Sequence, residues 1–153
     1  MNKKNFRNIL ENDSEEIFEL QNKYINDFGN NIWKSNELKI SIKNGFLEGD
    51  VFLIENRIAG FCFFREIDDY VEIYSIFVEP FFRKKGVAKQ FIRNCIEFCN
   101  KKNLKRIVLD VNEENFKAIN FYKKNNFILC GKRKNYYRIL EKFYDSLSMH
   151  LIL

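Results

Sequence analysis

Three neighbouring segments in the middle of the chain are rich in β-branched and aromatic residues. They are "VFLIE" at 51–55, "IAGFCFFREI" at 58–67 and "YVEIYSIFV" at 70–78, and only the dipeptides "NR" and "DD" separate them. Two-residue connections between such segments are typical of β-hairpins. The pattern therefore predicts three antiparallel strands in succession.

Apolar residues recur at three- and four-residue steps after these strands, as they do on one face of an α-helix. In "GVAKQFIRNCIEFCNKKN" (86–103) the recurring residues are Ala88, Phe91, Ile92, Cys95, Ile96 and Cys99. Earlier in the chain, Asp13 followed by Glu16 has the spacing of a capping box and predicts the start of a helix. The segment "WKSNELKISIKNG" (33–45) predicts a second short helix that ends at Gly45.

The remaining segments complete one pattern over the whole chain. "FRNIL" (6–10) and "RIVLDV" (106–111) predict strands, "NFKAINFYKKNN" (115–126) predicts a helix, and "FILCGKRKNYYRIL" and "SLSMHLIL" predict two closing strands. No linker, repeat or low-complexity segment interrupts the order β-α-α-β-β-β-α-β-α-β-β. We therefore expect residues 1–153 to form a single domain of the α+β class, with a mixed sheet and helices on both faces.

Charge and cysteine content narrow the possible partners. The chain has 26 Lys and Arg against 21 Asp and Glu, a net charge of +5, which suits an anionic small ligand or a loosely held nucleic acid. The four cysteines include no CxxC and His150 is the only histidine, so we expect no metal site and predict free, buried thiols. The sequence shows no signal peptide and no apolar run of about 20 residues, so we expect a cytoplasmic protein without a membrane partner.

A basic loop with a glycine leads from the third of these strands into the next helix. Pro80 cannot donate a ladder hydrogen bond and marks the end of the strand, and "FFRKKG" (81–86) follows. A helix N-terminus presents unpaired N–H groups that stabilise an anion, and Gly86 lets the backbone approach it closely. The loop is either a pyrophosphate site or a helix start that is basic without a ligand. Because basic residues oppose the helix dipole there, a bound anion is favoured.

A second group of polar residues lies in the strand at 106–111 and in the helix after it. The carboxylate of Asp110 is either a solvated charge at the strand end or part of a site, since an acid is unusual in a central strand. In the helix, Asn115, Ile119 and Tyr122 have the i, i+4, i+7 spacing of one face. Tyr122 is then either a core aromatic residue or a site residue that projects the same way as Asn115.

The segment "VEPFFRKKGVAKQFI" (78–92) resembles the acetyl-coenzyme A motif of the GNAT N-acetyltransferases, Arg/Gln-x-x-Gly-x-Gly/Ala after a strand that ends in Val-x-Pro. The order of strands and helices is similar too. The resemblance implies a seven-stranded, mostly antiparallel sheet, a strand end that parts from its neighbour, and acetyl-CoA as co-substrate without a metal. The coenzyme-binding residues that it implies are Ile76 and Val78 through their backbone, the loop residues Arg83, Lys84, Lys85, Gly86, Val87 and Ala88, and Asn115 and Tyr122.

The second half of the chain is similar to the RimI-like branch of that family, the ribosomal-protein alanine N-acetyltransferases. The similar features are Leu-Asp-Val at 109–111, Ala-x-x-x-Tyr at 118–122 and Lys-Asn-Tyr-Tyr at 134–137. This resemblance implies acetylation of a protein N-terminal α-amine, for example that of a basic ribosomal protein. It also implies that Asp110 acts as the base through a water, that Tyr122 protonates the leaving thiolate, and that Tyr136 and Tyr137 line the acceptor groove.

Two departures from the branch and two alternatives stay open. Asp110 stands where the branch usually has Glu, and Asn112 stands where it often has Arg. Another small-molecule or protein amine is an alternative acceptor. "GKRKNYY" (131–137) interleaves basic and aromatic residues as RNA-binding segments do. A non-enzymatic RNA-binding domain would not need the coenzyme motif, so we expect no stable nucleic-acid binding.

Overall fold

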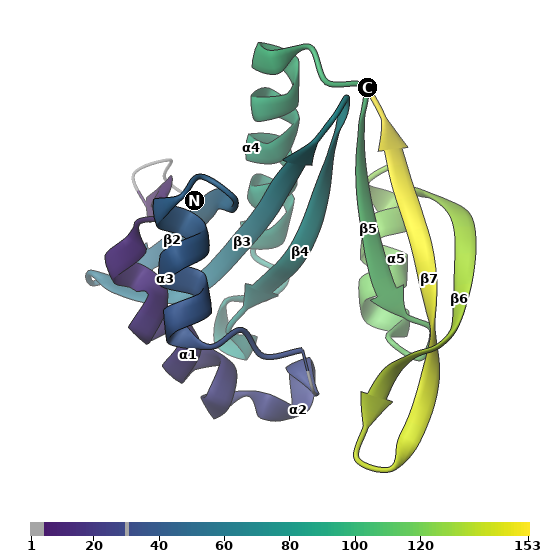
Figure 1. Ribbon diagram of the computed structural model, residues 1–153, viewed down its shortest axis with the longest axis horizontal. Coiled ribbons are helices and arrows are strands. Elements are labelled where there is room, and N and C mark those ends of the chain that lie inside the picture. The colour runs from purple at the N-terminus through teal and green to yellow at the C-terminus, as the bar shows by residue number, and fades with distance from the viewer. Residues whose placement is uncertain (1–4, 30) are drawn as a thin grey trace.

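A seven-stranded sheet runs through the chain in the computed structural model, which describes residues 5–29 and 31–153 (Figure 1). The strands are β1 (Phe6–Asn8), β2 (Glu48–Ile54), β3 (Arg57–Ile67), β4 (Tyr70–Val78), β5 (Arg106–Asn112), β6 (Ile128–Ile139) and β7 (Lys142–Ile152). Their order in the sheet is β1-β2-β3-β4-β5-β7-β6. Among these strands β4 and β5 form the single parallel pair, so the expected mixed, mostly antiparallel sheet is confirmed.

Helices cover both faces of the sheet. They are α1 (Ser14–Lys23), α2 (Ile25–Phe28), α3 (Ser35–Lys43), α4 (Val87–Lys102) and α5 (Phe116–Lys124), with the 3-10 turns η2 (Glu11–Asp13) and η3 (Pro80–Phe82). In Figure 1, α1 and α3 lie in front of the sheet, and α4 and α5 lie behind it. The α+β class is confirmed. In the described ranges no helix is both long and apolar enough to cross a membrane.

Apolar side chains form a buried layer on each face of the sheet. One layer lies between the sheet and the helices α4 and α5, and it includes Phe91 and Tyr122. The other lies between the sheet and the helices α1 and α3, and it includes Leu38 and Phe61. Burying one such side chain contributes about 1.5–3 kcal/mol. Packing of this kind holds α4 on the sheet, with its first residue close after the end of β4.

Asp13 is the N-cap residue of α1, as predicted, but the capping box predicted for Asp13 and Glu16 is wrong, because the Asp13 side chain makes no cap hydrogen bond. The helical segment begins one turn earlier, with η2, and the Asp13 carboxylate accepts a hydrogen bond from the N–H of Leu10 at 2.7 Å. Asp13 is 7% exposed and also pairs with Arg7 through two hydrogen bonds of 2.7 and 2.8 Å. Glu16 accepts from the N–H of Ile58 on β3 at 2.6 Å. The Asp13 carboxylate is therefore used by residues three and six positions earlier, and the Glu16 carboxylate by a residue 42 positions later.

The last two strands form a longer hairpin than predicted. β7 begins at Lys142, four residues before the predicted segment 146–153, because the hairpin extends beyond the rest of the sheet (Figure 1). β6 is the edge strand and most of its residues are exposed. Cys130 on β6 is exposed, so the predicted burial of the thiols is wrong for this residue. It holds for the three others: Cys62, Cys95 and Cys99.

β4 and β5 pair over only part of their length. Their parallel pairs end at Ile73 and Leu109, although both strands continue. In the ladder between β3 and β4, Tyr74 is an extra residue between Ile73 and Ser75, which makes a β-bulge. A bulge bends its strand and strengthens the local twist. Beyond Tyr74, β4 turns away from β5, and Figure 1 shows the two ribbons diverging from a common end.

Candidate active site

A cleft of about 650 Å³ lies where β4 and β5 part. Its walls come from the second half of β4, the end of β5, α2, α5 and the hairpin of β6 and β7. The site residues expected from the sequence that line it are Ile76, Val78, Arg83, Ala88, Asp110, Asn115, Tyr122 and Tyr137. Residues from α2, β4, α4, β5, α5 and the β6–β7 hairpin thus meet around one opening.

The free edge of β4 presents backbone groups to this cleft. The N–H of Glu79 donates to the carbonyl of Ala59 on β3 at 2.9 Å. Because alternate residues of an antiparallel strand bond to the same neighbour, Ile76 and Val78 direct their N–H and C=O groups away from β3. β5 has already diverged at this point, so within the described chain no strand accepts these groups. They form an open ladder edge that an extended ligand can join.

The loop before α4 has the backbone shape of an anion site. Lys84 has a φ of 59° and Gly86 a φ of 86°, both in the left-handed region. The N–H of Gln90 makes the first helical hydrogen bond, to the carbonyl of Gly86 at 3.0 Å. The N–H groups of residues 87–89 precede it and have no acceptor in the described residues. No acidic residue stands in the first turn of α4, and the basic run at residues 83–85 comes just before it.

The side chains of this loop have different roles. Val87 is buried, so its backbone alone is available to a ligand. The ammonium group of Lys85 lies 4.2 Å from the ring centre of Phe81. Arg83 turns toward β4 and α2: its Nε donates to the carbonyl of Val78 at 2.7 Å, and its Nη2 donates to Asp27 at 2.7 Å. The Arg83 side chain thus links the strand end to α2, and the carbonyl of Val78 already has a donor.

Asp110 is held by two partners at the edge of the cleft. Its Oδ1 accepts a hydrogen bond from the hydroxyl of Ser148 at 2.5 Å, and its Oδ2 lies 3.7 Å from Nη1 of Arg133. Its side chain is 12% exposed. The structure therefore contradicts the alternative in which Asp110 is a freely solvated charge at the strand end. The carboxylate lies in a polar, oriented position that faces the cleft.

Asn115 lies just before the first turn of α5, and Tyr122 lies about two turns further along the helix. Asn115 is the N-cap, and its side-chain oxygen accepts from the N–H of Ala118 at 3.2 Å. The Tyr122 ring packs against Phe121 and Phe127, with ring centres 5.4 and 5.5 Å away. Tyr122 is 6% exposed and still lines the cleft, so the two interpretations of this residue are compatible. Burial raises the pKa of Tyr122, with smaller contributions from Cys62 and Tyr137, so the hydroxyl keeps its proton at neutral pH.

The structure separates the two tyrosines expected in the acceptor groove. Tyr137 lines the cleft, and burial raises the pKa of Tyr137 to about 12. Tyr136 is 50% exposed and is not part of the cleft wall. Its ring packs edge-on against that of Tyr137 at 5.1 Å. Tyr136 therefore contacts the cleft residue from outside.

One wall of the cleft was not expected from the sequence. It is α2, which contributes Asn26, Asp27 and Phe28. Four residues are too few for a helical period, and the one local signal is Gly29, which ends α2 with a φ of 56°. A Cβ on Gly29 would lie 3.0 Å from Cγ1 of Ile139, so the end of α2 abuts β6.

The residues present fit acetyl-CoA by two observations. The open ladder edge of β4 suits an amide-containing arm such as pantetheine, and the donors at the start of α4 suit a pyrophosphate. In the described part of the chain, no three His, Cys, Asp or Glu side chains lie close enough together to hold a metal ion. The fit is thus to an organic anion with an extended arm.

Comparison with known families decides the class of protein. The profile of the acetyltransferase (GNAT) family matches residues 12–127. The chain belongs to the acetyltransferase (GNAT) family. The resemblance read from "VEPFFRKKGVAKQFI" is confirmed, and with it the expectation of an acetyltransferase.

Curated GNAT relatives match part of the chain. A putative [ribosomal protein bS18]-alanine N-acetyltransferase of Bacillus subtilis is 31% identical over 83 residues, which are 54% of this chain and 55% of that protein. The [ribosomal protein bS18]-alanine N-acetyltransferase of Salmonella typhimurium is 25% identical over 97 residues, which are 63% of this chain and 66% of that protein. The match thus spans from about half to just under two thirds of the length of these relatives.

Solved GNAT structures match nearly the whole chain. The ribosomal-protein-S18-alanine N-acetyltransferase of Escherichia coli has a TM-score of 0.81 at 18% identity, over 96% of this chain and 92% of that one. Arabidopsis thaliana NAA60 in complex with acetyl-CoA has a TM-score of 0.85 at 18% identity, over 97% of both chains. These likenesses confirm the predicted GNAT-like fold.

The backbone of the α4 loop leads to a prediction about acetyl-CoA affinity. Gly86→Glu places a side chain and a negative charge at the N–H groups of α4, so the dissociation constant for acetyl-CoA should rise at least ~100-fold, or about 2.7 kcal/mol. The measurement is isothermal titration calorimetry. Gly45→Glu is the matched control, because Gly45 also has a positive φ, of 69°, and has nothing within 4 Å. Equal acetyl-CoA affinity in the two variants contradicts the anion site.

Proposed function

We propose that this GNAT acetyltransferase moves an acetyl group from acetyl-CoA to a protein N-terminal α-amine. One observation carries the proposal: a single cleft connects the open edge of β4, the start of α4, and the side chains of Asp110 and Tyr122. The names of the Bacillus and Salmonella relatives support a ribosomal protein as the acceptor. We propose further that residues 1–153 act as one domain and that the enzyme works in the cytoplasm.

The chemistry of amines favours this acceptor. Only a neutral amine attacks a carbonyl carbon. A lysine amine with a pKa of about 10.4 loses its proton at pH 7 at a cost of about 4.6 kcal/mol, whereas an α-amine with a pKa of about 7.8 needs about 1 kcal/mol. Three carboxylates line the cleft, those of Asp27, Asp110 and Glu114. The one on β5, Asp110, is already engaged with Ser148 and Arg133. A base of this kind is better matched to an α-amine.

Each residue at the cleft has one proposed task. Bound acetyl-CoA supplies the acetyl group as a thioester. The N–H of Val78, which points away from β3, donates to the negative charge that develops on the carbonyl oxygen. Asp110 takes the proton of the amine through a water, and Tyr122 gives its proton to the departing sulfur. Tyr137 contacts the acceptor from the hairpin side of the cleft.

Short peptides with different N-terminal residues, incubated with acetyl-CoA, test the proposed acceptor. Mass spectrometry locates the acetyl group on each peptide. We expect acetylation of the α-amine and none on an internal lysine of the same peptide after its N-terminus has been blocked. Acetylation of the lysine alone, or of a polyamine in preference to every peptide, contradicts the proposed acceptor.

The Tyr122 hydroxyl leads to a prediction about turnover. Tyr122→Phe keeps the ring and its packing, so the melting temperature and the affinity for acetyl-CoA should hold. The turnover number should fall by ~10²–10⁴, the usual contribution of a positioned general acid. Steady-state kinetics and thermal melting on one preparation check this. Tyr70→Phe, which removes a hydroxyl from β4 outside the cleft, should stay active. A fully active Tyr122→Phe enzyme contradicts the role of proton donor.

The Asp110 carboxylate leads to a prediction about pH. An α-amine with a pKa of about 7.8 is about 95% protonated at pH 6.5 and about 6% protonated at pH 9. A base is therefore needed at the lower pH, and Asp110→Asn should lower kcat/KM about tenfold more at pH 6.5 than at pH 9. Asp69→Asn, at an exposed turn residue, is the control and should follow the wild-type profile. Equal losses for Asp110→Asn at both pH values show that Asp110 is not the base.

A further inference from the structure

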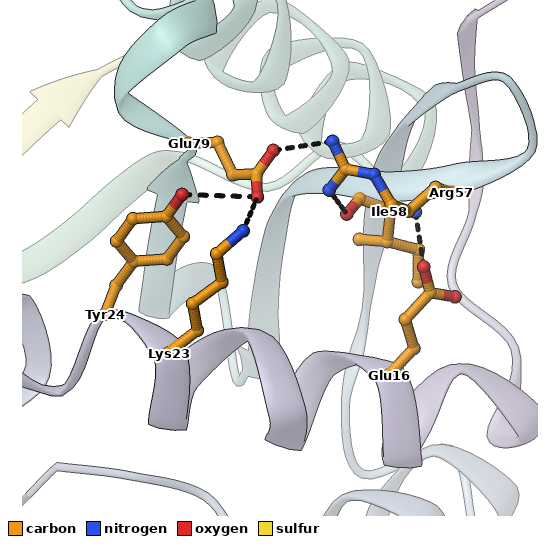
Figure 2. Close-up of polar contacts among 6 residues, drawn as sticks. All are labelled: Glu16, Lys23, Tyr24, Arg57, Ile58 and Glu79. Carbon is orange, nitrogen blue, oxygen red and sulfur yellow. Dashed lines mark hydrogen bonds and ion pairs between the residues drawn. The ribbon is translucent and has the colours of Figure 1, made fainter.

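A buried carboxylate that no step of the proposed chemistry uses lies directly after Val78. Glu79 is 4% exposed, and three groups meet its two oxygens (Figure 2). Oε1 accepts from Nζ of Lys23 at 3.3 Å and from the hydroxyl of Tyr24 at 3.4 Å. Oε2 accepts from Nη2 of Arg57 at 2.9 Å. One carboxylate thus joins the end of β4 to the end of α1 and the start of β3.

The partners of Glu79 lie at the junction between α1 and α2. Lys23 is the last residue of α1, and Tyr24 connects α1 to α2, the short helix that lines the cleft. Figure 2 shows α1 attached to the sheet at two points, by Glu16 near one end and by Lys23 near the other. The second of these points lies next to the cleft, because Val78, which precedes Glu79, and Asn26, three residues after Lys23, both line it.

Two further contacts tie the same segments together. The ring of Phe77 on β4 lies 5.3 Å from that of Tyr24 and 5.0 Å from that of Phe28. Arg83 bridges the carbonyl of Val78 and the carboxylate of Asp27. The segments 77–79 and 24–28 are therefore joined by three sets of contacts. Glu79 supplies the buried charge among these contacts, and it has two cationic partners.

We propose that Glu79 is a positioning residue for acetyl transfer, which sets α2 at a fixed place relative to the backbone of Val78. The acceptor amine lies against α2, and the thioester lies against β4. The carboxylate of Glu79 holds these two walls at the separation at which the amine meets the thioester. This role rests on the proposed function, because it concerns the alignment of its two substrates.

The charge state of Glu79 agrees with this geometry. Burial by itself would raise the pKa of this carboxyl, but hydrogen bonds and charges from Arg57 and Lys23 outweigh it and hold the pKa below its usual value. The carboxylate is thus ionised throughout the neutral range. Both cations keep their partner under the conditions in which an N-terminal amine reacts.

The chain offers a matched control for removal of this charge. Asp13 is also a buried carboxylate, 7% exposed, paired with an arginine at 2.7 and 2.8 Å. It lies outside the cleft wall. Glu79→Gln and Asp13→Asn each keep the side-chain shape and remove one buried charge, so both should lower the melting temperature by a few degrees. They should differ at the active site.

Glu79→Gln should raise the KM for the acceptor peptide about tenfold or more and lower kcat, while the dissociation constant for acetyl-CoA changes less than about threefold. Amide hydrogen exchange should accelerate at residues 25–29, where α2 is ordered. Asp13→Asn should change the KM for the acceptor peptide and the exchange rate at residues 25–29 by no more than about twofold. Lys23→Gln, at a residue whose side chain is 62% exposed, removes a single partner and should act in the same direction with little loss of stability. If Glu79→Gln does not fold, Lys23→Gln takes its place in the experiment.

The possible failures are distinguishable. If Glu79→Gln and Lys23→Gln leave the exchange at residues 25–29 unchanged, or if their acceptor kinetics match those of Asp13→Asn, Glu79 has no positioning role. A wild-type enzyme that acetylates none of the peptides contradicts the proposed function itself. In that case the exchange experiment still decides whether Glu79 holds α2.

Discussion

The parting of β4 from β5 is the constraint on which the rest of the site depends. Parallel pairing stops at Ile73 and Leu109, and the bulge at Tyr74 bends β4 at the same place. A continuous sheet would have used the N–H and C=O groups of Ile76 and Val78 in a ladder. Their release costs the fold some backbone hydrogen bonds and leaves polar groups that a ligand with amide groups can satisfy.

Other elements compensate for this opening from both sides. Arg83 donates to the carbonyl of Val78, and Glu79 binds the end of α1, so the free end of β4 is anchored although β5 has left it. On the other side of the cleft, β7 keeps β5 in the sheet, because it pairs with β5 along the full length of β5. β4 and β5 therefore diverge while each strand stays anchored by other contacts. The cleft lies between them.

Local patterns predicted the parts of the site that depend on neighbouring residues. The strand 70–78 and the basic loop before α4 were predicted because Pro80 and Gly86 mark their ends, and the apolar period of α4 shows its buried face. The wall formed by α2 and the Glu79 cluster could not be predicted in this way. Lys23 and Glu79 are 56 residues apart, and a carboxylate after a strand carries no local sign of its partner. The predicted capping box at Asp13 failed for a different reason, since Arg7, only six residues earlier, binds the carboxylate.

Amide-resolved hydrogen exchange of the free chain, with and without acetyl-CoA, tests the central claim most directly. The open edge of β4 predicts that acetyl-CoA slows exchange at the N–H groups of Ile76 and Val78 and at residues 84–88. The N–H of Phe77 faces β3 and serves as an internal reference that should not change. If acetyl-CoA binds and leaves exchange at Ile76 and Val78 unaltered, the divergence of β4 and β5 is not the coenzyme site.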